Sequence, residues 1–359
     1  MCRLLDMIKN DTSILIIGDD DTIKKTSTYI EIWRDVEIEL VDLYLFNNEC
    51  NEIDYDMYDL VVISPSVKIK NIINKKFYRL SEDDLFEIKN KATQLRIRSK
   101  LRFEVHIVEH CNLNCCGCNH FSPLAKEKYL NLDDYIKDIE RLSYLFQGEM
   151  EYIELLGGEP LLHPNIECFM IETRKKFPIG QIVLVTNGVL LSKMKNHFWD
   201  VLRKNDIILS PTRYPIPVDY DYIRKLAEER GVKYEEFDMK TDLAGNKILE
   251  NFHIDVCGNN DKEEMFRKCN RGNECVFLCN GKIFSCVTGA NIKHLKEYFN
   301  IDSINNLEED GIDIYKVKSG EEILLHILKP MNACAYCNIH EKKDYIKFRQ
   351  SKRMIDEWI

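Results

Sequence analysis

One short segment, residues 111–118, constrains what this chain can fold into more than any other. It places Cys111, Cys115 and Cys118 in a C-x₃-C-x₂-C pattern. Three thiols at this spacing can converge on one inorganic cluster, whereas a cubane iron–sulfur cluster normally takes four thiolates. The pattern therefore leaves one iron without a protein ligand, and an open metal position is where a substrate or cosubstrate binds. The alternatives are a zinc site that lacks one ligand and a chance triplet in a cysteine-rich chain.

The residues on both sides of this segment predict a strand, a loop and a helix. Residues 103–108 alternate between apolar and polar side chains, which favours a half-buried strand. Apolar residues between positions 132 and 145 recur at helical spacing. The thiols therefore follow the carboxyl end of a strand, which is where α/β barrels carry their chemistry.

The cysteine segment resembles a known family. Cys111, Cys115 and Cys118 match the CxxxCxxC signature of radical S-adenosylmethionine (SAM) enzymes. Residues 110–124 (HCNLNCCGCNHFSPL) resemble the branch linked to polysaccharide and sugar modification, although Gly117 stands where many members carry an aromatic residue. The resemblance implies a [4Fe–4S] cluster whose open iron binds SAM, and cleavage of SAM to a 5′-deoxyadenosyl radical that abstracts hydrogen from a substrate. It also implies a reducing partner such as flavodoxin or ferredoxin.

The remaining strands and helices predict an α/β fold in several parts. A chain of 359 residues exceeds the size of a single core, so two or three domains are expected. We expect a small N-terminal α/β domain with a linker helix at 1–100, a partial (β/α)₆ radical SAM barrel at 101–260, and a cysteine-rich auxiliary-cluster domain at 261–359. The N-terminal prediction rests on strands at 13–18, 37–45 and 60–64 and helices at 22–33, 66–76 and 81–100. The barrel prediction rests on further strands at 152–156, 181–185, 206–209, 232–237 and 252–256, and on helices at 164–177, 194–202 and 218–229.

Several residues at predicted strand ends are candidates for binding SAM. Gly157, Gly158 and Glu159 follow the second barrel strand and match the GGE motif, which in radical SAM enzymes binds the methionyl amino group. By the same resemblance, cofactor contacts are expected from the residues that follow the next two strands, namely Asn187, Ser210 and Arg213. For Asn187 the alternative is a role in the turn alone, and for the last two the alternatives are a capping serine and a solvated arginine. No catalytic acid or base is assigned.

A second group of cysteines predicts an auxiliary site. Four thiolates are available, namely Cys269, Cys286 and the C-x₂-C pair Cys334 and Cys337. Cys275 and Cys279 are alternatives to Cys269, because spacing separates the three poorly. The pattern resembles the twitch domain, a shortened SPASM domain, which implies one auxiliary [4Fe–4S] cluster. Four thiolates also suit tetrahedral zinc. The tail at 344–359 reads as an amphipathic helix.

Composition argues against several partners. No long uncharged apolar run exists, so no membrane span is expected. A net charge of −10 argues against a nucleic-acid partner. Fourteen cysteines, with no secretion signal at the N-terminus, indicate a reducing, cytoplasmic setting.

These observations favour an oxidoreductase-type radical SAM enzyme. The expected substrate is a carbohydrate-like or nucleotide-linked small molecule that is oxidised or epimerised. A peptide- or protein-modifying radical SAM enzyme, of the RiPP or sulfatase-maturase kind, is the alternative. An iron–sulfur electron carrier or a zinc protein is the alternative from a different class.

Overall fold

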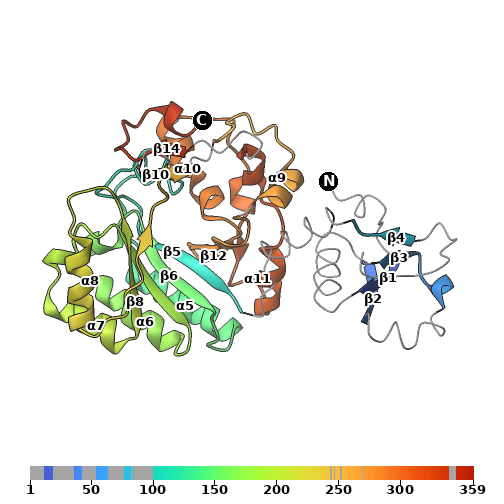
Figure 1. Ribbon diagram of the computed structural model, residues 1–359, viewed down its shortest axis with the longest axis horizontal. Coiled ribbons are helices and arrows are strands. Elements are labelled where there is room, and N and C mark those ends of the chain that lie inside the picture. The colour runs from blue at the N-terminus through green and yellow to red at the C-terminus, as the bar shows by residue number, and fades with distance from the viewer. Residues whose placement is uncertain are drawn as a thin grey trace. The chain divides into compact units, whose positions relative to one another are not determined.

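The chain divides into two compact units, Met1–Ile97 and Arg98–Ile359, and each is described by itself. The computed structural model describes residues 12–18, 36–42, 54–63, 77–81, 84, 100–242, 245, 247–250, 253–269, 271–338 and 345–359. Figure 1 shows the helices and strands of these residues as ribbons.

The first unit contains a parallel sheet with the strand order β2-β1-β3-β4. Its elements are β1 (Thr12–Gly18), β2 (Val36–Asp42), the 3₁₀ turn η1 (Tyr55–Met57), β3 (Leu60–Ile63) and β4 (Phe77–Arg79). Apolar side chains of β1 and β3 form its buried cluster, as expected for strands covered on both faces. The first three strands match the sequence prediction, whereas β4 is too short to give a sequence signal. The predicted helices at 22–33 and 66–76 lie outside the described residues.

The predicted linker helix is described only at its beginning. The Asp84 backbone N–H donates to the Ser81 hydroxyl over 3.0 Å, and the Ser81 backbone N–H donates to the Asp84 carboxylate over 2.9 Å. Such reciprocal bonds satisfy backbone donors at the start of a helix. Most of the remaining positions of the predicted helix lie outside the described residues.

The second unit is built on an eight-stranded sheet with the order β13-β12-β11-β5-β6-β7-β8-β9. The six strands from β11 to β9 run parallel, and β12 and β13 add antiparallel strands beyond β11. The strands are β5 (Arg102–Val108), β6 (Tyr152–Gly157), β7 (Gln181–Thr186), β8 (Ile207–Arg213), β9 (Phe237–Asp238), β11 (Phe277–Cys279), β12 (Lys282–Phe284) and β13 (Ile312–Asp313). This mixed α/β sheet is consistent with the partial radical SAM barrel predicted from the sequence.

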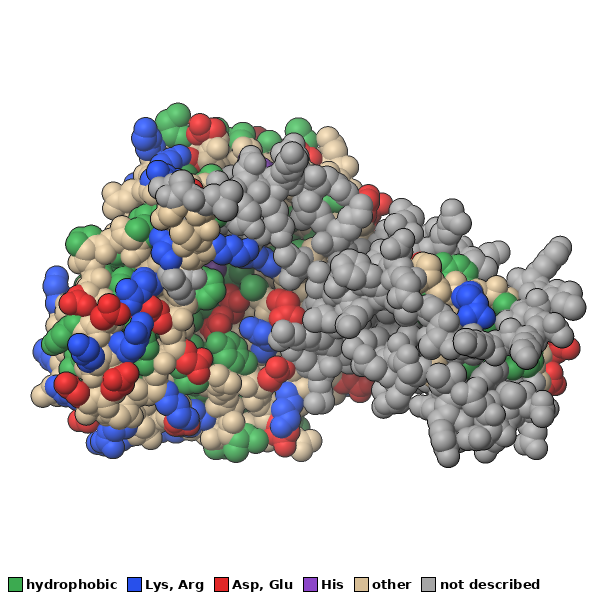
Figure 2. Space-filling view, viewed as in Figure 1, with side chains coloured by type: hydrophobic (Ala, Val, Ile, Leu, Met, Phe, Trp, Pro, Cys, Tyr) green, Lys and Arg blue, Asp and Glu red, His purple; other side chains and the backbone are tan. Residues whose placement is uncertain are grey.

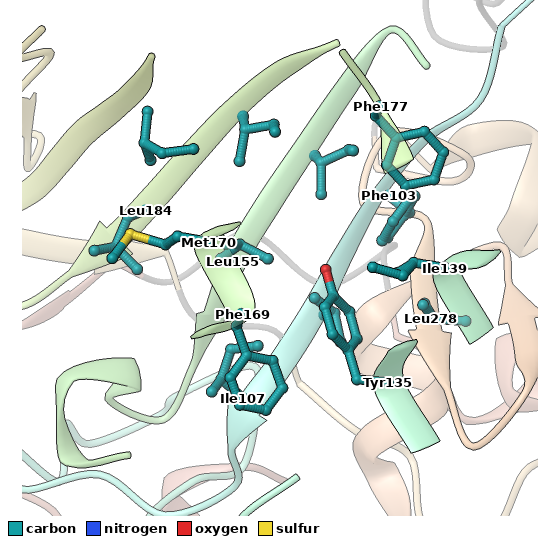
Figure 3. Close-up of a cluster of buried hydrophobic side chains, with 14 of the residues drawn as sticks. Phe103, Ile107, Tyr135, Ile139, Leu155, Phe169, Met170, Phe177, Leu184 and Leu278 are labelled. Atoms are coloured by element: carbon teal, nitrogen blue, oxygen red, sulfur yellow. The ribbon is translucent and has the colours of Figure 1, made fainter. Parts of the chain in front are cut away.

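Four helices pack along one side of this sheet and enclose the main core (Figure 1). They are α5 (Leu132–Leu145), α6 (Ile166–Lys176), α7 (Asn196–Lys204) and α8 (Tyr220–Glu229). Figure 3 shows Phe103 and Ile107 of β5 facing Tyr135 and Phe169 of α5 and α6. Each large side chain buried there contributes about 1.5–3 kcal/mol. Because neighbouring strand residues point to opposite faces, the side chains between these core positions face the other side of the sheet.

The sequence prediction of the sixth strand is wrong. Residues 253–256 form no sheet strand in the described chain, and Ile254 makes only an isolated antiparallel bridge to Cys337. The sixth parallel strand is β11, which joins the opposite edge of the sheet beside β5. Phe277 and Leu278 of β11 are almost fully buried there, so their apolar burial holds the strand in place. The strand predicted at 232–237 is reduced to a bridge at Tyr234 and to β9.

The predicted C-terminal helix is also wrong within the described residues 345–359. This segment forms β14 (Tyr345–Lys347), which pairs with β10 (Ile248–Glu250), and the 3₁₀ turn η6 (Ile355–Glu357). The other described elements are α9 (Lys262–Lys268), α10 (Val287–Phe299), α11 (Gly320–His326), η2 (Pro160–Leu162), η3 (Leu191–Lys193), η4 (Leu307–Glu309) and η5 (Asn332–Tyr336). Among the helices described, none has the length and apolarity needed to cross a membrane. Figure 2 shows acidic and basic side chains interspersed over the visible, described surface.

Candidate active site

The cysteine loop begins at the carboxyl end of β5 and brings three thiols to one cavity. Cys111, Cys115 and Cys118 all line this cavity, which has a volume of about 490 Å³. Within the loop, Asn114 and Gly117 have φ angles of 52° and 64°. Glycine adopts this left-handed conformation without steric cost, which accounts for Gly117 where many radical SAM enzymes carry an aromatic residue.

The three thiols lie close enough for their charges to interact. Burial, with the charges of Glu159 and Cys118, raises the pKa of Cys111 to about 12. Burial also raises the pKa of Cys115, and the charges of Cys118 and Cys111 add to this, whereas a hydrogen bond from Tyr214 opposes it. Burial likewise raises the pKa of Cys118. Such thiols remain protonated by themselves and become thiolates when a metal group supplies positive charge.

The glycine pair of the GGE motif packs directly against the start of the cysteine loop. A Cβ atom on Gly157 would lie 2.2 Å from the Val108 carbonyl oxygen, and one on Gly158 would lie 2.1 Å from the His110 carbonyl oxygen. The backbone N–H of Gly158 donates to the Val108 carbonyl over 2.7 Å. The two glycines therefore allow the end of β6 to approach the cysteine loop, and both also line the cavity.

Glu159 is fully buried and is absent from the described cavity wall. Its Oε1 accepts hydrogen bonds from the Leu161 backbone N–H at 3.0 Å and from the Thr186 hydroxyl at 2.7 Å. Its Oε2 accepts from the Asn187 backbone N–H at 2.8 Å. Burial raises the pKa of Glu159 to about 7, against the effect of these hydrogen bonds. The carboxylate thus ties the end of β7 to the GGE turn.

The other predicted cofactor contacts are divided between the cavity and its surroundings. Asn187 lines the cavity, and its side-chain amide donates to the Asn112 side chain over 2.7 Å. Ser210 also lines the cavity, but it lies within β8 rather than after it, because this strand extends further than predicted. Arg213 is not part of the described wall. Its guanidinium pairs with Glu236 at 2.6 Å and with Asp221 at 2.7 Å.

Two carboxylates on adjacent strands line the same cavity. Glu104 of β5 and Glu154 of β6 are direct neighbours in the parallel register. Burial and the charge of Glu154 raise the pKa of Glu104 to about 8, against the charges of Arg102 and Arg271. No motif marks this pair in the sequence, although Glu104 occupies a polar position in the alternating pattern of β5. That alternation is the signal that could have identified it.

A buried chain of polar side chains fixes His120 in the cavity wall. His120 lines the cavity, and its Nδ1 lies 2.8 Å from Nε2 of His106. The other nitrogen of His106, Nδ1, lies 2.9 Å from Oε2 of Glu109. Burial raises the pKa of Glu109, but hydrogen bonds from His106 and His294 outweigh it and hold the pKa well below its usual range. Glu109 therefore remains charged and orients His106 and His294, the two histidines that it contacts.

The C-terminal segment 345–359 binds the outer side of the cysteine loop. The backbone N–H of Cys116 donates to the Arg349 carbonyl over 2.9 Å. The backbone N–H of Ser351 donates to the Asn114 carbonyl over 2.7 Å. The loop that carries the thiols is thus held by backbone bonds from a segment more than two hundred positions away in the sequence.

Trp358 fixes the end of this segment to the third cysteine. Its side chain is almost fully buried and packs near Phe121, and its indole N–H donates to the Cys118 carbonyl over 3.0 Å. Glu357 accepts a 2.6 Å hydrogen bond from Arg349 and so closes the segment on itself. No sequence pattern signals these contacts, because they join two irregular segments.

The second group of cysteines is also drawn together. Burial raises the pKa of Cys337, and the charges of Cys334, Cys286 and Cys269 raise it further. The pKa of Cys334 is raised by burial and by Cys286 and Cys269. Among the described residues, however, no group of three or more His, Cys, Asp or Glu side chains is arranged to hold a single metal ion.

The two alternative cysteines have other close neighbours. Burial raises the pKa of Cys275, and the largest neighbouring charge is that of Glu104, ahead of Cys286. The Cys279 sulfur lies 3.6 Å from the Lys293 ammonium nitrogen. Neither thiol has the close relation to Cys334 and Cys337 that Cys269 has.

Comparison with known proteins identifies the domain that carries this site. Residues 105–269 match the family model described as the Radical SAM superfamily. The matched segment includes the cysteine loop, the GGE motif and most of the parallel strands. Residues 105–269 therefore carry a radical SAM domain, as the sequence predicts.

Similar proteins include two enzymes named GTP 3′,8-cyclase. The one from Trichodesmium erythraeum is 33% identical over 111 residues, which cover 29% of this chain and 33% of that protein. The one from Helicobacter pylori is 32% identical over 93 residues, which cover 25% and 28%. The chain thus spans about a third of the length of these curated relatives.

Two solved structures are also similar to this chain. BtrN in complex with AdoMet and 2-DOIA is 16% identical, with a TM-score of 0.41 and coverage of 67% of this chain and 94% of that one. SuiB of Streptococcus suis is 17% identical, with a TM-score of 0.33 and coverage of 56% and 48%.

Proposed function

We propose that this protein is an oxidoreductase-type radical SAM enzyme that oxidises or epimerises a carbohydrate-like or nucleotide-linked small molecule. One observation carries the proposal: three thiols on one loop face a cavity that is also lined by the GGE glycines, within a radical SAM domain. The donor set fits a [4Fe–4S] cluster with one open iron, because three soft thiol ligands come from one loop.

The residues of the chain supply binding and orientation. A bound cluster supplies the electron that cleaves SAM to methionine and a 5′-deoxyadenosyl radical. Cys111, Cys115 and Cys118 would hold the cluster, and Gly157 and Gly158 leave the cavity open beside it because they carry no side chains. Glu159 accepts a hydrogen bond from the backbone N–H of Asn187. Through this bond it positions Asn187 in the polar wall of the cavity. Surrounding protein excludes water from the reacting atoms.

We assign the auxiliary cluster to Cys269, Cys286, Cys334 and Cys337. The support is that the charges of the other three thiols all act on Cys337. A cluster with four protein ligands has no open iron, so its role is electron transfer or structure. In a net oxidation such a cluster would supply an electron acceptor near the substrate, and a flavodoxin or ferredoxin would be the reductant of the SAM-binding cluster.

Two other functions are weighed against this proposal. The relatives named GTP 3′,8-cyclase favour a nucleotide substrate, but the matched segment covers only about a third of each. A peptide-modifying function has no comparable feature in its favour, since the described part of the first unit is a parallel α/β sheet. An electron carrier or zinc protein would not require the two glycines beside the thiols.

The test is anaerobic turnover with dithionite as reductant. The reconstituted wild-type protein is expected to convert SAM to 5′-deoxyadenosine, and variants with alanine at each of the three loop cysteines are expected to form none. Equal amounts of 5′-deoxyadenosine from wild type and variants would refute the proposed function.

A further inference from the structure

The geometry points to Glu104 and Glu154 as the residues that select the substrate: they bind hydroxyl groups of an uncharged, unphosphorylated polyol and disfavour phosphorylated nucleotides. This inference rests on the proposed function and specifies the substrate of the same cavity. It goes beyond the motif residues, because neither glutamate belongs to the cysteine loop or the GGE turn.

The two side chains face the cavity because of their strand positions. Glu104 and Glu154 are paired in register on adjacent parallel strands, so their side chains lie side by side on the same face. Phe103 and Val105, on either side of Glu104, belong to the core on the opposite face. Glu104 is only 7% exposed although it lines a cavity of about 490 Å³. Glu154 beside it is half-buried, and polar groups withdrawn from water in this way require hydrogen-bond partners.

The pair offers both a donor and an acceptor. A hydrogen bond joins the buried Glu104 to the half-buried Glu154, and two carboxylates this close do not both ionise. One proton between them leaves a hydroxyl donor on one side chain and acceptor oxygens on both. Such a pair is complementary to a vicinal diol, in which each hydroxyl both donates and accepts. Tyr152 lines the cavity as well, and its phenolic hydroxyl forms a hydrogen bond with Glu154.

An independent observation at the same cavity also indicates a polar ligand. Ser122 lines the cavity and is only 3% exposed, yet its hydroxyl oxygen has no hydrogen-bond partner of ordinary geometry. The side chain of Ser122 also acts on the Cys118 thiol, whose pKa it lowers. A buried hydroxyl without a partner costs about 1–3 kcal/mol, which a ligand hydroxyl would recover.

The charges of the cavity disfavour phosphate. Among the described lining residues, Arg271 is the one Lys or Arg side chain, and it acts on Glu104. The charge of the carboxylate pair and that of Arg271 therefore offset each other. A triphosphate would bring several negative charges into this cavity without matching cations. Like charges close together in a poorly screened site cost several kcal/mol.

The experiment measures which compounds donate hydrogen to SAM. The reconstituted, dithionite-reduced full-length protein is incubated with SAM and one of three probes. These are a pool of uniformly deuterated hexoses and cyclitols, the same pool as monophosphates, and deuterated GTP. Deuterium in 5′-deoxyadenosine is read by mass spectrometry. We expect transfer from the unphosphorylated pool only.

Shape-conserving variants test the two residues. In Glu104→Gln/Glu154→Gln, transfer from the unphosphorylated pool is expected to fall at least 10-fold. In the matched control Glu229→Gln, on the exposed face of α8, transfer is expected to equal that of wild type. Circular dichroism shows whether the double variant is folded. If it is not folded, the comparison of the three probes with the wild-type protein tests the inference by itself.

Three results would overturn the inference. They are transfer from the monophosphates or GTP at a rate within 3-fold of the unphosphorylated pool, transfer from no pool, and unchanged transfer in a folded double variant. Formation of 5′-deoxyadenosine without any added substrate separates these failures from failure of the proposed function. Wild type that cleaves SAM but takes deuterium from no pool retains the enzyme class and loses the substrate assignment.

Discussion

Replacing Glu159 by alanine should destabilise the second unit far more than its single carboxylate suggests. The side chain is fully buried and accepts three hydrogen bonds, from the Leu161 and Asn187 backbone N–H groups and the Thr186 hydroxyl. Alanine leaves all three donors buried without an acceptor. Each unpaired donor costs about 1–3 kcal/mol, so the total is about 3–9 kcal/mol. This is comparable to the whole stability of a typical domain, about 5–15 kcal/mol.

The glutamine variant separates the hydrogen bonds from the shape of the side chain. Glu159→Gln keeps one oxygen, which can still accept from Leu161 and Thr186, but its amide nitrogen faces the Asn187 N–H. One of the three bonds is then lost, and the expected cost is about 1–3 kcal/mol. Urea denaturation of the reconstituted protein measures the free energy of unfolding of both variants. A shift of the midpoint without a change in the denaturant slope reports the loss of stability. Glu228→Ala, on the exposed face of α8, is the control and should leave the midpoint unchanged. An alanine variant no less stable than the glutamine variant would refute this reasoning.

Three further predictions follow from the same contacts. Gly157→Ala should cost about 1–3 kcal/mol or more in urea, because the new Cβ would lie 2.2 Å from the Val108 carbonyl oxygen; a midpoint equal to wild type would contradict the close packing. Burial and the charge of Glu154 raise the pKa of Glu104 from 4.5 to about 8, so the folded state holds a proton that the unfolded chain releases. Stability should therefore fall as pH rises from about 4.5 to 8, and Glu104→Gln should flatten this slope in urea midpoints against pH; an unchanged slope would exclude Glu104 as its source. Trp358→Phe removes the indole donor to the cysteine loop and should speed iron loss to a chelator about 2- to 13-fold, the equivalent of one hydrogen bond; the buried Trp199→Phe should not, and equal rates for both variants would show that the contact does not hold the loop.

Local patterns in the sequence predict most of the barrel and the thiols, because these depend on short-range spacing. The apolar spacing between 132 and 145 corresponds to α5 of the structure. The Asn131 side chain caps the first turn of this helix. The sixth strand could not be predicted, since residues 277–279 are too short to read as a barrel strand. Only their pairing with β5, far away in sequence, makes them one.

The site was predicted less completely than the fold, for a physical reason. Motifs identify residues that bind a group at fixed spacing, such as the loop cysteines and the GGE glycines. Glu104 and Glu154 come together only through strand register, and Trp358 reaches Cys118 only through a tertiary contact. Arg213 is the opposite case. It follows the site residues closely in sequence, but its side chain forms ion pairs with Glu236 and Asp221.

The central claim is that Cys111, Cys115 and Cys118 hold a cubane cluster whose fourth iron is free to bind SAM. The most direct measurement is the electron paramagnetic resonance spectrum of the dithionite-reduced protein, recorded with and without SAM. To isolate this cluster, the spectrum of the variant with alanine at all three cysteines is subtracted. We predict a [4Fe–4S] signal that shifts when SAM is added. A signal that is unchanged by SAM, or a difference spectrum without any iron–sulfur signal, would contradict the claim.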